Sequence, residues 1–403
     1  MDAISQQEAE LKWMEAGNVF TPGSPVSTRD LFAGRRDQLQ EIMGAISQRG
    51  YHAVLYGERG VGKTSLSNIL VTILGAMPQA SLIGRVNCDA GDTFSSIWHK
   101  ALRDISFTNP QRGIGFNAAD TVAHTPVSAT LPTVVQPDDI RRTLSDLSRH
   151  ARVLIILDEY DRIVDRQVAT LVSDTIKALS DFGVDATVLI IGVADTIDDL
   201  IEGHQSIERA VVQIPMPRMS DEEIAEILDT GVSKLGMQMD GGARAHLVHL
   251  TQGLPYVAHL LGLHTTRVAL QGHARTITRS HADQGIQRSL EQWQQSIRTA
   301  YVDAIRSPQP VNLFKEVLLA CALAETDELG YFSASSIRAP LKQITGRLLD
   351  IPSFARHLKE FSTEGRGGII ERVGTARKLR YRFTSPLMRP YIIMRGYDDG
   401  LLK

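Results

Sequence analysis

The chain contains 403 residues, of which 43% are hydrophobic and 22% are charged, and its formal net charge is −3. This length allows two or three domains with separate cores, and the composition argues against a largely disordered protein. The first residues form neither a basic nor an apolar leader, and no uncharged run approaches the length that crosses a bilayer, so we expect a cytoplasmic protein without a membrane partner. Cys88 and Cys321 have no metal-ligand spacing and favour neither a disulfide framework nor a zinc site.

In chain order, residues 1–18 predict an amphipathic helix to which we assign no chemistry. The sequence leaves open whether this helix packs on the main domain or stays mobile. An extended Pro/Gly segment follows from Phe20, and the stretch Asp30–Leu39 opens a second helix that ends near Ser47.

The next stretch fits the phosphate-loop pattern G-x-x-x-x-G-K-[ST] between an apolar strand, His52–Tyr56, and a helix from Ser65 to Val71. Its glycines let the backbone aim several N–H groups at one phosphate. Lys63 is placed to reach the β- and γ-phosphates of ATP, and the Thr64 hydroxyl can ligate Mg²⁺. The expected nucleotide-binding residues are Gly57, Glu58, Arg59, Gly60, Val61, Gly62, Lys63, Thr64 and Ser65.

About 25 residues before this loop, the sequence Phe32-Ala33-Gly34-Arg35 precedes a helix. This segment resembles the one that lies over the nucleotide base in the AAA+ superfamily, especially in its origin-recognition-like and STAND branches. The resemblance covers the chain from Phe20 onward. It implies an α/β fold of the P-loop NTPase type, with a three-layer parallel sheet over residues 19–218, a helical lid over residues 219–306 and a winged helix over residues 308–403.

Within the expected core, Leu82–Cys88 reads as the next strand, and a helix follows it to Ile105. Over residues 107–137 the character changes, because Gly, Pro, Ser, Thr and Asn make up 14 of 31 residues. Such a segment buries too little apolar surface to fold by itself. We predict a mobile surface insertion there.

The run Arg152–Asp161 is an aliphatic strand that ends in acids, as expected of a central parallel strand buried on both faces. Ligands of open α/β sheets bind at the carboxyl edge, where these acids lie. Asp158 can hold the hydration shell of Mg²⁺, and Glu159 can polarise the attacking water. The alternative is that both acids merely cap the end of the strand.

The resemblance implies functional roles for three further residues. Asp195 follows the apolar run from Thr187, where the family often has an Asn or Thr that senses the γ-phosphate; a helix N-cap is the alternative. Arg209 precedes the strand Val211–Ile214, where the family often keeps an arginine finger that acts on a neighbouring subunit; an ordinary exposed arginine is the alternative. Pro255, in Gly253-Leu254-Pro255, resembles the STAND signature at which a proline touches the nucleotide.

After the break near Ser307, helices at about 312–324, 334–344 and 352–361 precede two strand-like runs, which together predict a winged helix-turn-helix. Residues 331–395 contain 13 Lys and Arg against 4 Asp and Glu, the footprint expected of a nucleic-acid surface. The expected DNA-phosphate contacts are Arg356 and Lys359 on the third helix and Lys378, Arg380 and Arg382 on the hairpin. Winged helices also dock proteins, so a protein partner is the alternative.

We therefore expect an ATP-hydrolysing switch that uses Mg²⁺, assembles into a nucleotide-dependent homo-oligomer and binds double-stranded DNA through its winged helix. A signalling scaffold of the STAND type, in which the winged helix docks a partner protein, is the alternative function. A small-molecule kinase is disfavoured because the lid and the winged helix offer no evident acceptor pocket.

Overall fold

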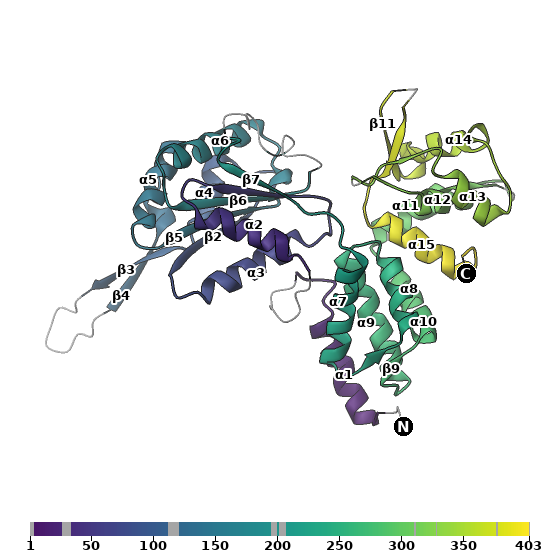
Figure 1. The fold of residues 1–403 in the computed structure, drawn as a ribbon. Coiled ribbons are helices and arrows are strands. Elements are labelled where there is room, and N and C mark those ends of the chain that lie inside the picture. Colours follow the sequence, from purple (N-terminus) through teal and green to yellow (C-terminus); the bar gives the residue numbers. More distant parts are fainter. Residues whose placement is uncertain are drawn as a thin grey trace. The chain divides into compact units, whose positions relative to one another are not determined.

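The computed structural model describes residues 4–25, 34–111, 121–194, 200, 207–309, 312–327, 329–375 and 378–402. The chain forms two compact units, whose elements are labelled in Figure 1. The sheet unit comprises residues 25–58 and 62–216, and the helical unit comprises residues 1–24, 59–61 and 217–403. No helix within the described ranges is long and apolar enough to cross a bilayer.

The sheet unit is built on a five-stranded parallel sheet with the order β2-β5-β6-β1-β7. The strands are β1 (His52–Tyr56), β2 (Ser81–Asn87), β5 (Arg152–Asp158), β6 (Ala186–Gly192) and β7 (Val211–Pro215). All residues of β6, and all but the first of β5, are buried, which explains their continuous aliphatic sequences. Because the strands are parallel, the phosphate loop after β1 and the acids after β5 leave the same edge of the sheet.

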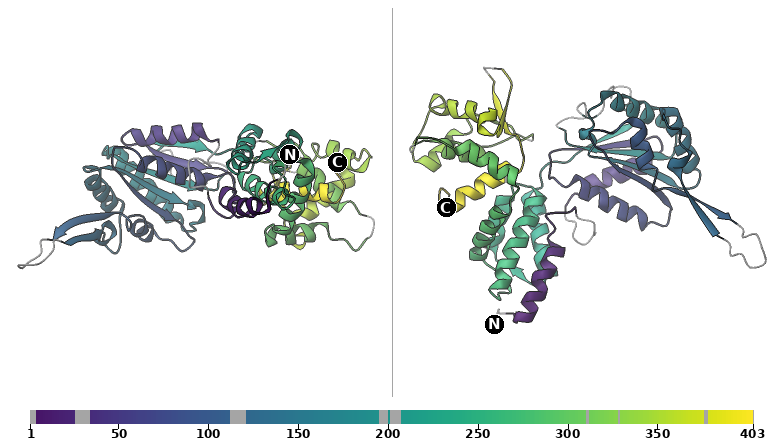
Figure 2. Two further views of the ribbon diagram at one scale, coloured as in Figure 1. Left: turned by 90° about the horizontal axis from the view of Figure 1, so that it is seen from below. Right: turned by 180° about the vertical axis from the view of Figure 1, so that it is seen from behind.

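Helices cover both faces of this sheet, as Figures 1 and 2 show. The helices are α2 (Arg36–Ser47), α3 (Lys63–Gly75), α4 (Phe94–Ala101), α5 (Pro137–Ser148) and α6 (Arg166–Asp181), with short 3₁₀ turns η2 (Val127–Thr130) and η3 (Tyr160–Arg162). Buried side chains of α4, α5 and α6, such as Trp98, Leu144 and Ile176, form one core with Ile155 of β5. With α2 and α3 on the opposite face, this three-layer arrangement confirms the predicted fold class.

The predicted mobile insertion over residues 107–137 is the main difference from the sequence analysis. Strands β3 (Ser106–Gln111) and β4 (Thr121–Pro126) pair as an antiparallel hairpin, and residues 112–120 lie outside the described ranges. The following residues Val127, Leu131 and Val135 are buried in the core beneath α4 and α5. These three apolar side chains, spaced four residues apart, anchor a segment whose average composition suggested none.

The lid of the helical unit consists of α7 (Asp221–Lys234), α8 (Gly241–Thr251), α9 (Pro255–Gln271), α10 (Arg279–Glu291) and α11 (Gln295–Ile305), with a short parallel ladder of β8 (Gln238–Met239) and β9 (Thr276–Ile277). Ser220 and Glu223 form a capping box at the start of α7. Helix α9 is buried around nearly its whole circumference and forms the centre of this bundle.

The N-terminal helix α1 (Gln6–Val19) belongs to the helical unit and packs along α9. The ring of Phe20, directly after it, is buried against Gly231 and Gly262, where an added Cβ would lie 2.3 Å and 2.5 Å from the ring. The guanidinium of Arg267 lies 4.0 Å from the centre of the Trp13 ring. Of the two possibilities left open by the sequence, the helix is packed.

The C-terminal domain contains α12 (Phe314–Leu323), β10 (Phe332–Ser333), α13 (Arg338–Thr345), α14 (Ile351–Phe361), the 3₁₀ turn η6 (Glu364–Arg366), β11 (Ile370–Val373), β12 (Arg380–Phe383) and α15 (Met388–Asp398). Its antiparallel sheet has the order β10-β12-β11. The three predicted helices and both hairpin strands are present, whereas the sequence analysis missed β10 and α15. Tyr391 of α15 lies 5.6 Å from Trp293 and 5.4 Å from Tyr301 of the lid, measured between ring centres, so both regions share one aromatic core.

Candidate nucleotide-binding site

The phosphate loop connects the interior strand β1 to helix α3. Gly57 has φ +150°, and a Cβ there would lie 2.5 Å from the carbonyl oxygen of Met216, so no larger residue fits. Gly62 caps the N-terminus of α3 with φ +98°, which directs the chain into the helix at Lys63. The first backbone N–H groups of α3 have no partners within the helix, and they carry the positive end of its dipole.

Lys63 is the first residue of α3, and its side chain turns back into the loop. Only 8% of the residue is exposed, and Nζ donates to the carbonyl oxygens of Gly57 and Glu58, both at 2.8 Å. Thr64 and Ser65 follow in the first helical turn. A buried ammonium group beside a helix N-terminus fits the phosphate groups of a nucleotide, because each of these charges is complementary to an anion.

Asp158, the last residue of β5, is fixed by two donors. Its carboxylate accepts a hydrogen bond from the backbone N–H of Glu159 at 2.9 Å. It also forms an ion pair with the guanidinium of Arg85 at 2.8 Å. Arg85 comes from the neighbouring strand β2 and also donates to the side-chain carbonyl of Asn68 on α3. The sequence analysis missed Arg85, although a charged residue within the apolar run Leu82–Cys88 was a signal for it.

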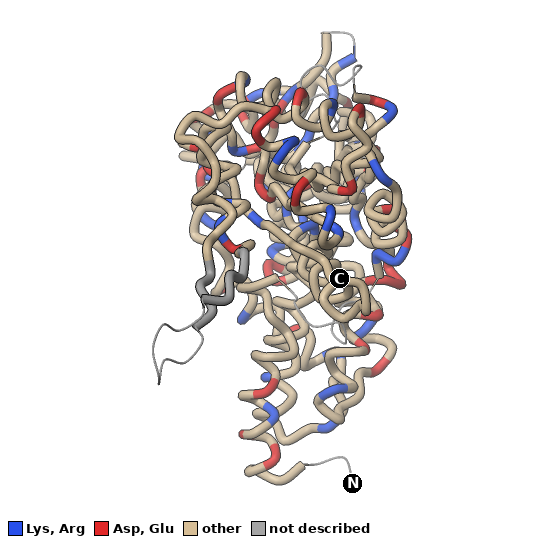
Figure 3. The backbone as a smooth tube through the Cα atoms, turned by 90° about the vertical axis from the view of Figure 1, so that its left-hand side faces the viewer, with Lys and Arg blue, Asp and Glu red and all other residues tan. Residues whose placement is uncertain are grey.

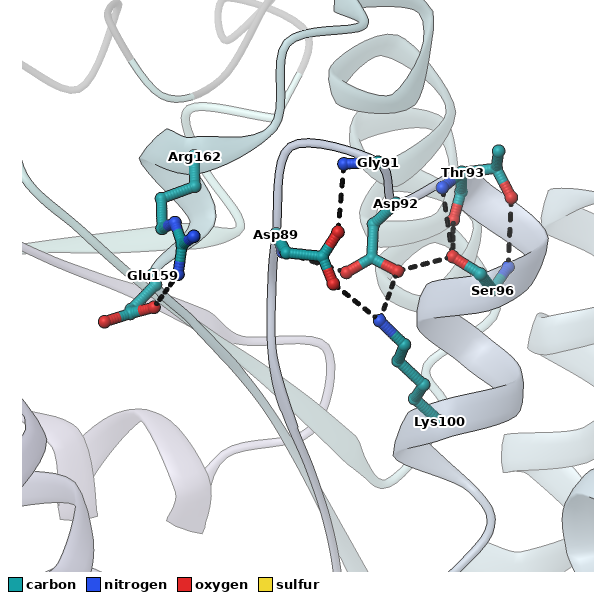
Figure 4. Close-up of polar contacts among 8 residues, drawn as sticks. All are labelled: Asp89, Gly91, Asp92, Thr93, Ser96, Lys100, Glu159 and Arg162. Atoms are coloured by element: carbon teal, nitrogen blue, oxygen red, sulfur yellow. Dashed lines mark hydrogen bonds and ion pairs between the residues drawn. The ribbon is translucent and has the colours of Figure 1, made fainter.

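Glu159 lies just outside the sheet in a left-handed backbone conformation, with φ +54°. Its carboxylate pairs with Arg162 at 2.8 Å, and the side chains of Glu159 and Arg162 are 49% and 54% exposed. Ion pairs with this exposure contribute about 0–1 kcal/mol. The contact, shown in Figure 4, is therefore a weak one.

A second polar cluster follows β2 and lies beside this pair in Figure 4. Lys100 bridges Asp89 and Asp92 at 3.0 Å and 2.6 Å, and Asp92 also accepts from the Ser96 hydroxyl. The Lys100 hydrogen bond, followed by that of the Gly91 N–H, lowers the pKa of Asp89. This cluster, which the sequence analysis did not find, fixes the loop between β2 and α4.

The remaining predicted residues have different positions. Asp195 lies outside the described residues, but β6 ends nearby, where the Val193 N–H donates to Asp161 at 2.7 Å. Arg209 is exposed in the turn of residues 207–210 that leads into β7. Their roles in sensing and in a finger stay predictions.

Pro255 is the first residue of α9 in the helical unit. Gln252 and Gly253 before it have φ +51° and +73°, and the Gly253 carbonyl accepts from the Met219 N–H at 2.9 Å. This turn joins α8 to α9 and explains the local need for glycine, because a Cβ on Gly253 would lie 2.6 Å from the Met219 carbonyl oxygen. Contact between Pro255 and a nucleotide stays a prediction.

In the part of the chain that the structure describes, no group of three or more His, Cys, Asp or Glu residues could hold a metal ion. Thr64 and Asp158 supply a hydroxyl and a carboxylate oxygen, which are the hard ligands that Mg²⁺ prefers. Mg²⁺ in nucleotide sites takes few protein ligands and binds mainly phosphate oxygens and water. The residues present therefore fit this ion.

The family model of Novel STAND NTPase 1 matches residues 25–320, which include the complete sheet unit and the lid. The chain belongs to this family. This assignment confirms the predicted resemblance to the STAND branch. No curated protein sequence matches the chain.

Among the solved structures that share the fold of this STAND NTPase are one from Aeropyrum pernix and one from Pyrococcus abyssi. The ORC2 protein of Aeropyrum pernix, solved in ADPNP and ADP complexes, is 14% identical with a TM-score of 0.50, over 95% of this chain and 98% of that chain. A Walker-type ATPase of Pyrococcus abyssi is 14% identical with a TM-score of 0.52, over 93% of this chain and 99% of that chain. At these identities the similarity shows the fold alone.

The cations predicted to contact DNA lie on the C-terminal domain of the STAND NTPase, and several have acidic partners. Arg380 pairs with Asp327 at 2.8 Å, Arg382 with Glu371 at 2.6 Å, and Arg356 with Glu360 at 2.6 Å. Lys359 and Lys378 are exposed, the first on α14 and the second just before β12.

The acidic partners in these pairs reduce the net positive charge on which the predicted DNA surface was based. Asp327 lies just outside the segment 331–395 that gave the strong positive balance. Over residues 308–403 there are 15 Lys and Arg against 10 Asp and Glu, a net charge of +5. Acidic and basic positions are interspersed along the backbone in Figure 3.

Proposed function

We propose that this STAND NTPase is an ATP-binding and ATP-hydrolysing switch that uses Mg²⁺. The observation that carries this proposal is the buried Lys63 ammonium at the N-terminus of α3, on the sheet edge where β5 presents Asp158 and Glu159. Membership in an NTPase family supports nucleotide use.

Each residue has one role in the proposed reaction. Lys63 and the N–H groups of the loop bind and orient the phosphates, and they stabilise the negative charge that develops in the transition state. Thr64 and Asp158 would hold Mg²⁺, which neutralises phosphate charge when it is bound. Glu159 would orient the attacking water and accept its proton.

The test compares ATP binding by isothermal titration and phosphate release for the parent protein and Lys63→Ala. The variant should lose roughly 100-fold or more in ATP affinity, because it removes a charge-assisted contact from a buried phosphate site. Lys177→Ala, on the exposed face of α6, is the matched control and should bind as the parent does. Equal ATP affinity of the parent and Lys63→Ala would refute the proposed site.

We further propose that the C-terminal domain, a winged helix by its order of elements, binds duplex DNA through Lys359, Lys378 and the neighbouring cations. Exposed ion pairs such as Arg380–Asp327 are weak and exchange readily for phosphate. The expected duplex affinity is steeply salt-dependent.

Docking of a partner protein is the second candidate function for this domain. The ion pairs of Arg356, Arg380 and Arg382 favour it, since they reduce the charge available to a polyanion. Absence of duplex binding by the intact protein at low salt, both with and without ATP, would select this candidate.

The exposed position of Arg209 supports the proposal that it acts as a finger on a neighbouring subunit in a nucleotide-dependent homo-oligomer. Arg209→Ala should keep the ATP affinity of the monomer and lower hydrolysis only at concentrations where subunits associate. A parent whose specific activity is constant across that range would exclude this role.

A further inference from the structure

Arg85 joins three elements of the sheet unit from the middle of β2. Its Nη2 donates to Oδ2 of Asp158 at 2.8 Å, and its Nη1 donates to the side-chain oxygen of Asn68. Asn68 lies four residues after Thr64 on α3, so these two side chains share one face of the helix. The guanidinium therefore ties the helix of the phosphate loop to the strand that carries the proposed metal ligand.

The register of the sheet explains this geometry. Asn87 of β2 lies opposite Asp158 of β5, and Arg85 lies opposite Ile156. Alternate residues of a strand share a face, so Arg85 and Asp158 both point toward the layer of α3. Thr64, Asn68 and Arg85 also line one hollow of about 600 Å³.

Charge makes this contact relevant to nucleotide binding. The Asp158 side chain is only 3% exposed, and a buried carboxylate without a partner is strongly unfavourable. Such a carboxylate would also repel a triphosphate at the same sheet edge. A metal ion can supply the missing positive charge, but here the guanidinium already does so.

We propose that Arg85 is a positioning residue whose guanidinium neutralises Asp158, so that the nucleotide can bind before the metal ion. The guanidinium and the metal ion would then compete for the Asp158 carboxylate. This inference rests on the proposed function of the same site. It predicts that Arg85 changes the metal dependence of ATP affinity, which a purely structural ion pair would not change.

The test is a double-variant cycle with Arg85→Gln, Asp158→Asn and the combination of both. ATP affinity of the full chain is measured by titration calorimetry in excess Mg²⁺ and in excess EDTA. Arg85→Gln should lose at least tenfold more affinity in EDTA than in Mg²⁺, because only Mg²⁺ can replace the missing charge. The combined variant should recover the metal-free affinity of the parent to within about threefold, because no net charge has been removed.

Two further variants control this cycle. Arg85→Lys keeps the charge and should keep most of the metal-free affinity. Arg49→Gln removes an exposed arginine just before β1, at the amino-terminal ends of the strands and away from the phosphate loop. This variant should not change the metal dependence of ATP affinity.

The possible outcomes separate the two proposals. A folded Arg85→Gln variant that loses the same affinity in Mg²⁺ and in EDTA would overturn the role of Arg85 while leaving the nucleotide site intact. A parent that binds no ATP in either condition would overturn both. If Arg85→Gln does not fold, Asp158→Asn decides: its metal-free ATP affinity should equal or exceed that of the parent, and a tenfold fall would contradict the inference.

Discussion

The phosphate site and the C-terminal domain differ in what happens to their predicted charged residues. Lys63, Asp158 and Glu159 lie at one edge of a parallel sheet, as their strands require. In the C-terminal domain, by contrast, three of the five predicted DNA contacts form ion pairs within the chain. The fold positions charged side chains that belong to a backbone motif. Charged side chains on an exposed surface instead form ion pairs with nearby acids.

Two ion pairs of equal length allow a direct comparison of these environments. Arg85–Asp158 and Arg380–Asp327 both measure 2.8 Å, but the acid side chains are 3% and 41% exposed. Asp158→Ala should destabilise the sheet unit by about 3–5 kcal/mol because it leaves the partly buried Arg85 guanidinium without its acidic partner. Asp327→Ala should cost about 0–1 kcal/mol.

Urea unfolding can measure both changes in separate units. Trp98 is the tryptophan of the sheet unit, and Trp293 belongs to the helical unit, so single-tryptophan backgrounds report each unfolding transition. Equal losses of stability for the two variants would show that burial does not distinguish these pairs.

The sequence predicted the sheet unit well because its signals are periodic and local. Aliphatic runs over β5 and β6 predicted buried strands, and the spacing of the loop predicted the start of α3 to within two residues. The contacts between distant segments were not predictable in this way. Arg85 and Asp158 are 73 residues apart, Arg380 and Asp327 are 53 apart, and only the folded register brings each pair together.

Buried histidines affect the acid stability of both units, but among the described residues the helical unit has more of them. In the sheet unit, burial lowers the pKa of His52 to about 3. Burial lowers the pKa values of His246, His259 and His264, all in the helical unit, to about 4. Since these values lie below the unfolded value of about 6.5, the unfolded chain binds more protons, and stability falls as the pH drops from about 6.5 toward 4. We expect a loss of about 2 kcal/mol per histidine between pH 6.5 and 5.

The Trp293 background measures this loss by urea unfolding at pH 7 and pH 5. Replacing His264 with Leu should remove part of the pH dependence, while His99→Gln, at a partly exposed site of the sheet unit, should not. A stability of the helical unit that is constant over this range would contradict the lowering of these pKa values by burial.

The salt dependence of duplex affinity tests how the ion pairs of the C-terminal domain affect DNA binding. Lys378→Ala should reduce the log–log slope of duplex affinity against salt by about one unit, since an unshared lysine neutralises about one phosphate. Replacing Arg380 and Arg382 together should reduce it by less than two units, because their acids already compete with phosphate. Asp327→Asn should strengthen duplex binding. A full loss of three units when Lys378, Arg380 and Arg382 are all replaced by Ala would show that the ion pairs open completely on DNA.

Arg162 should give the smallest effect. Its pair with Glu159 is exposed on both sides, so Arg162→Ala should change the turnover number for ATP by no more than about threefold. Steady-state phosphate release measures this change, with Arg149→Ala as a control for an exposed arginine paired to a nearby acid. A change of more than tenfold would assign Arg162 a role in catalysis.

The most direct test of the account is the contrast between binding and turnover in Glu159→Gln. If Glu159 accepts the proton of the attacking water, the variant should bind ATP as tightly as the parent and hydrolyse it on the order of 100-fold or more slowly. Titration calorimetry and single-turnover phosphate release measure the two quantities on the same preparation. Hydrolysis at the parental rate, with ATP bound at the parental affinity, would contradict the assignment of the reaction to this edge of the sheet.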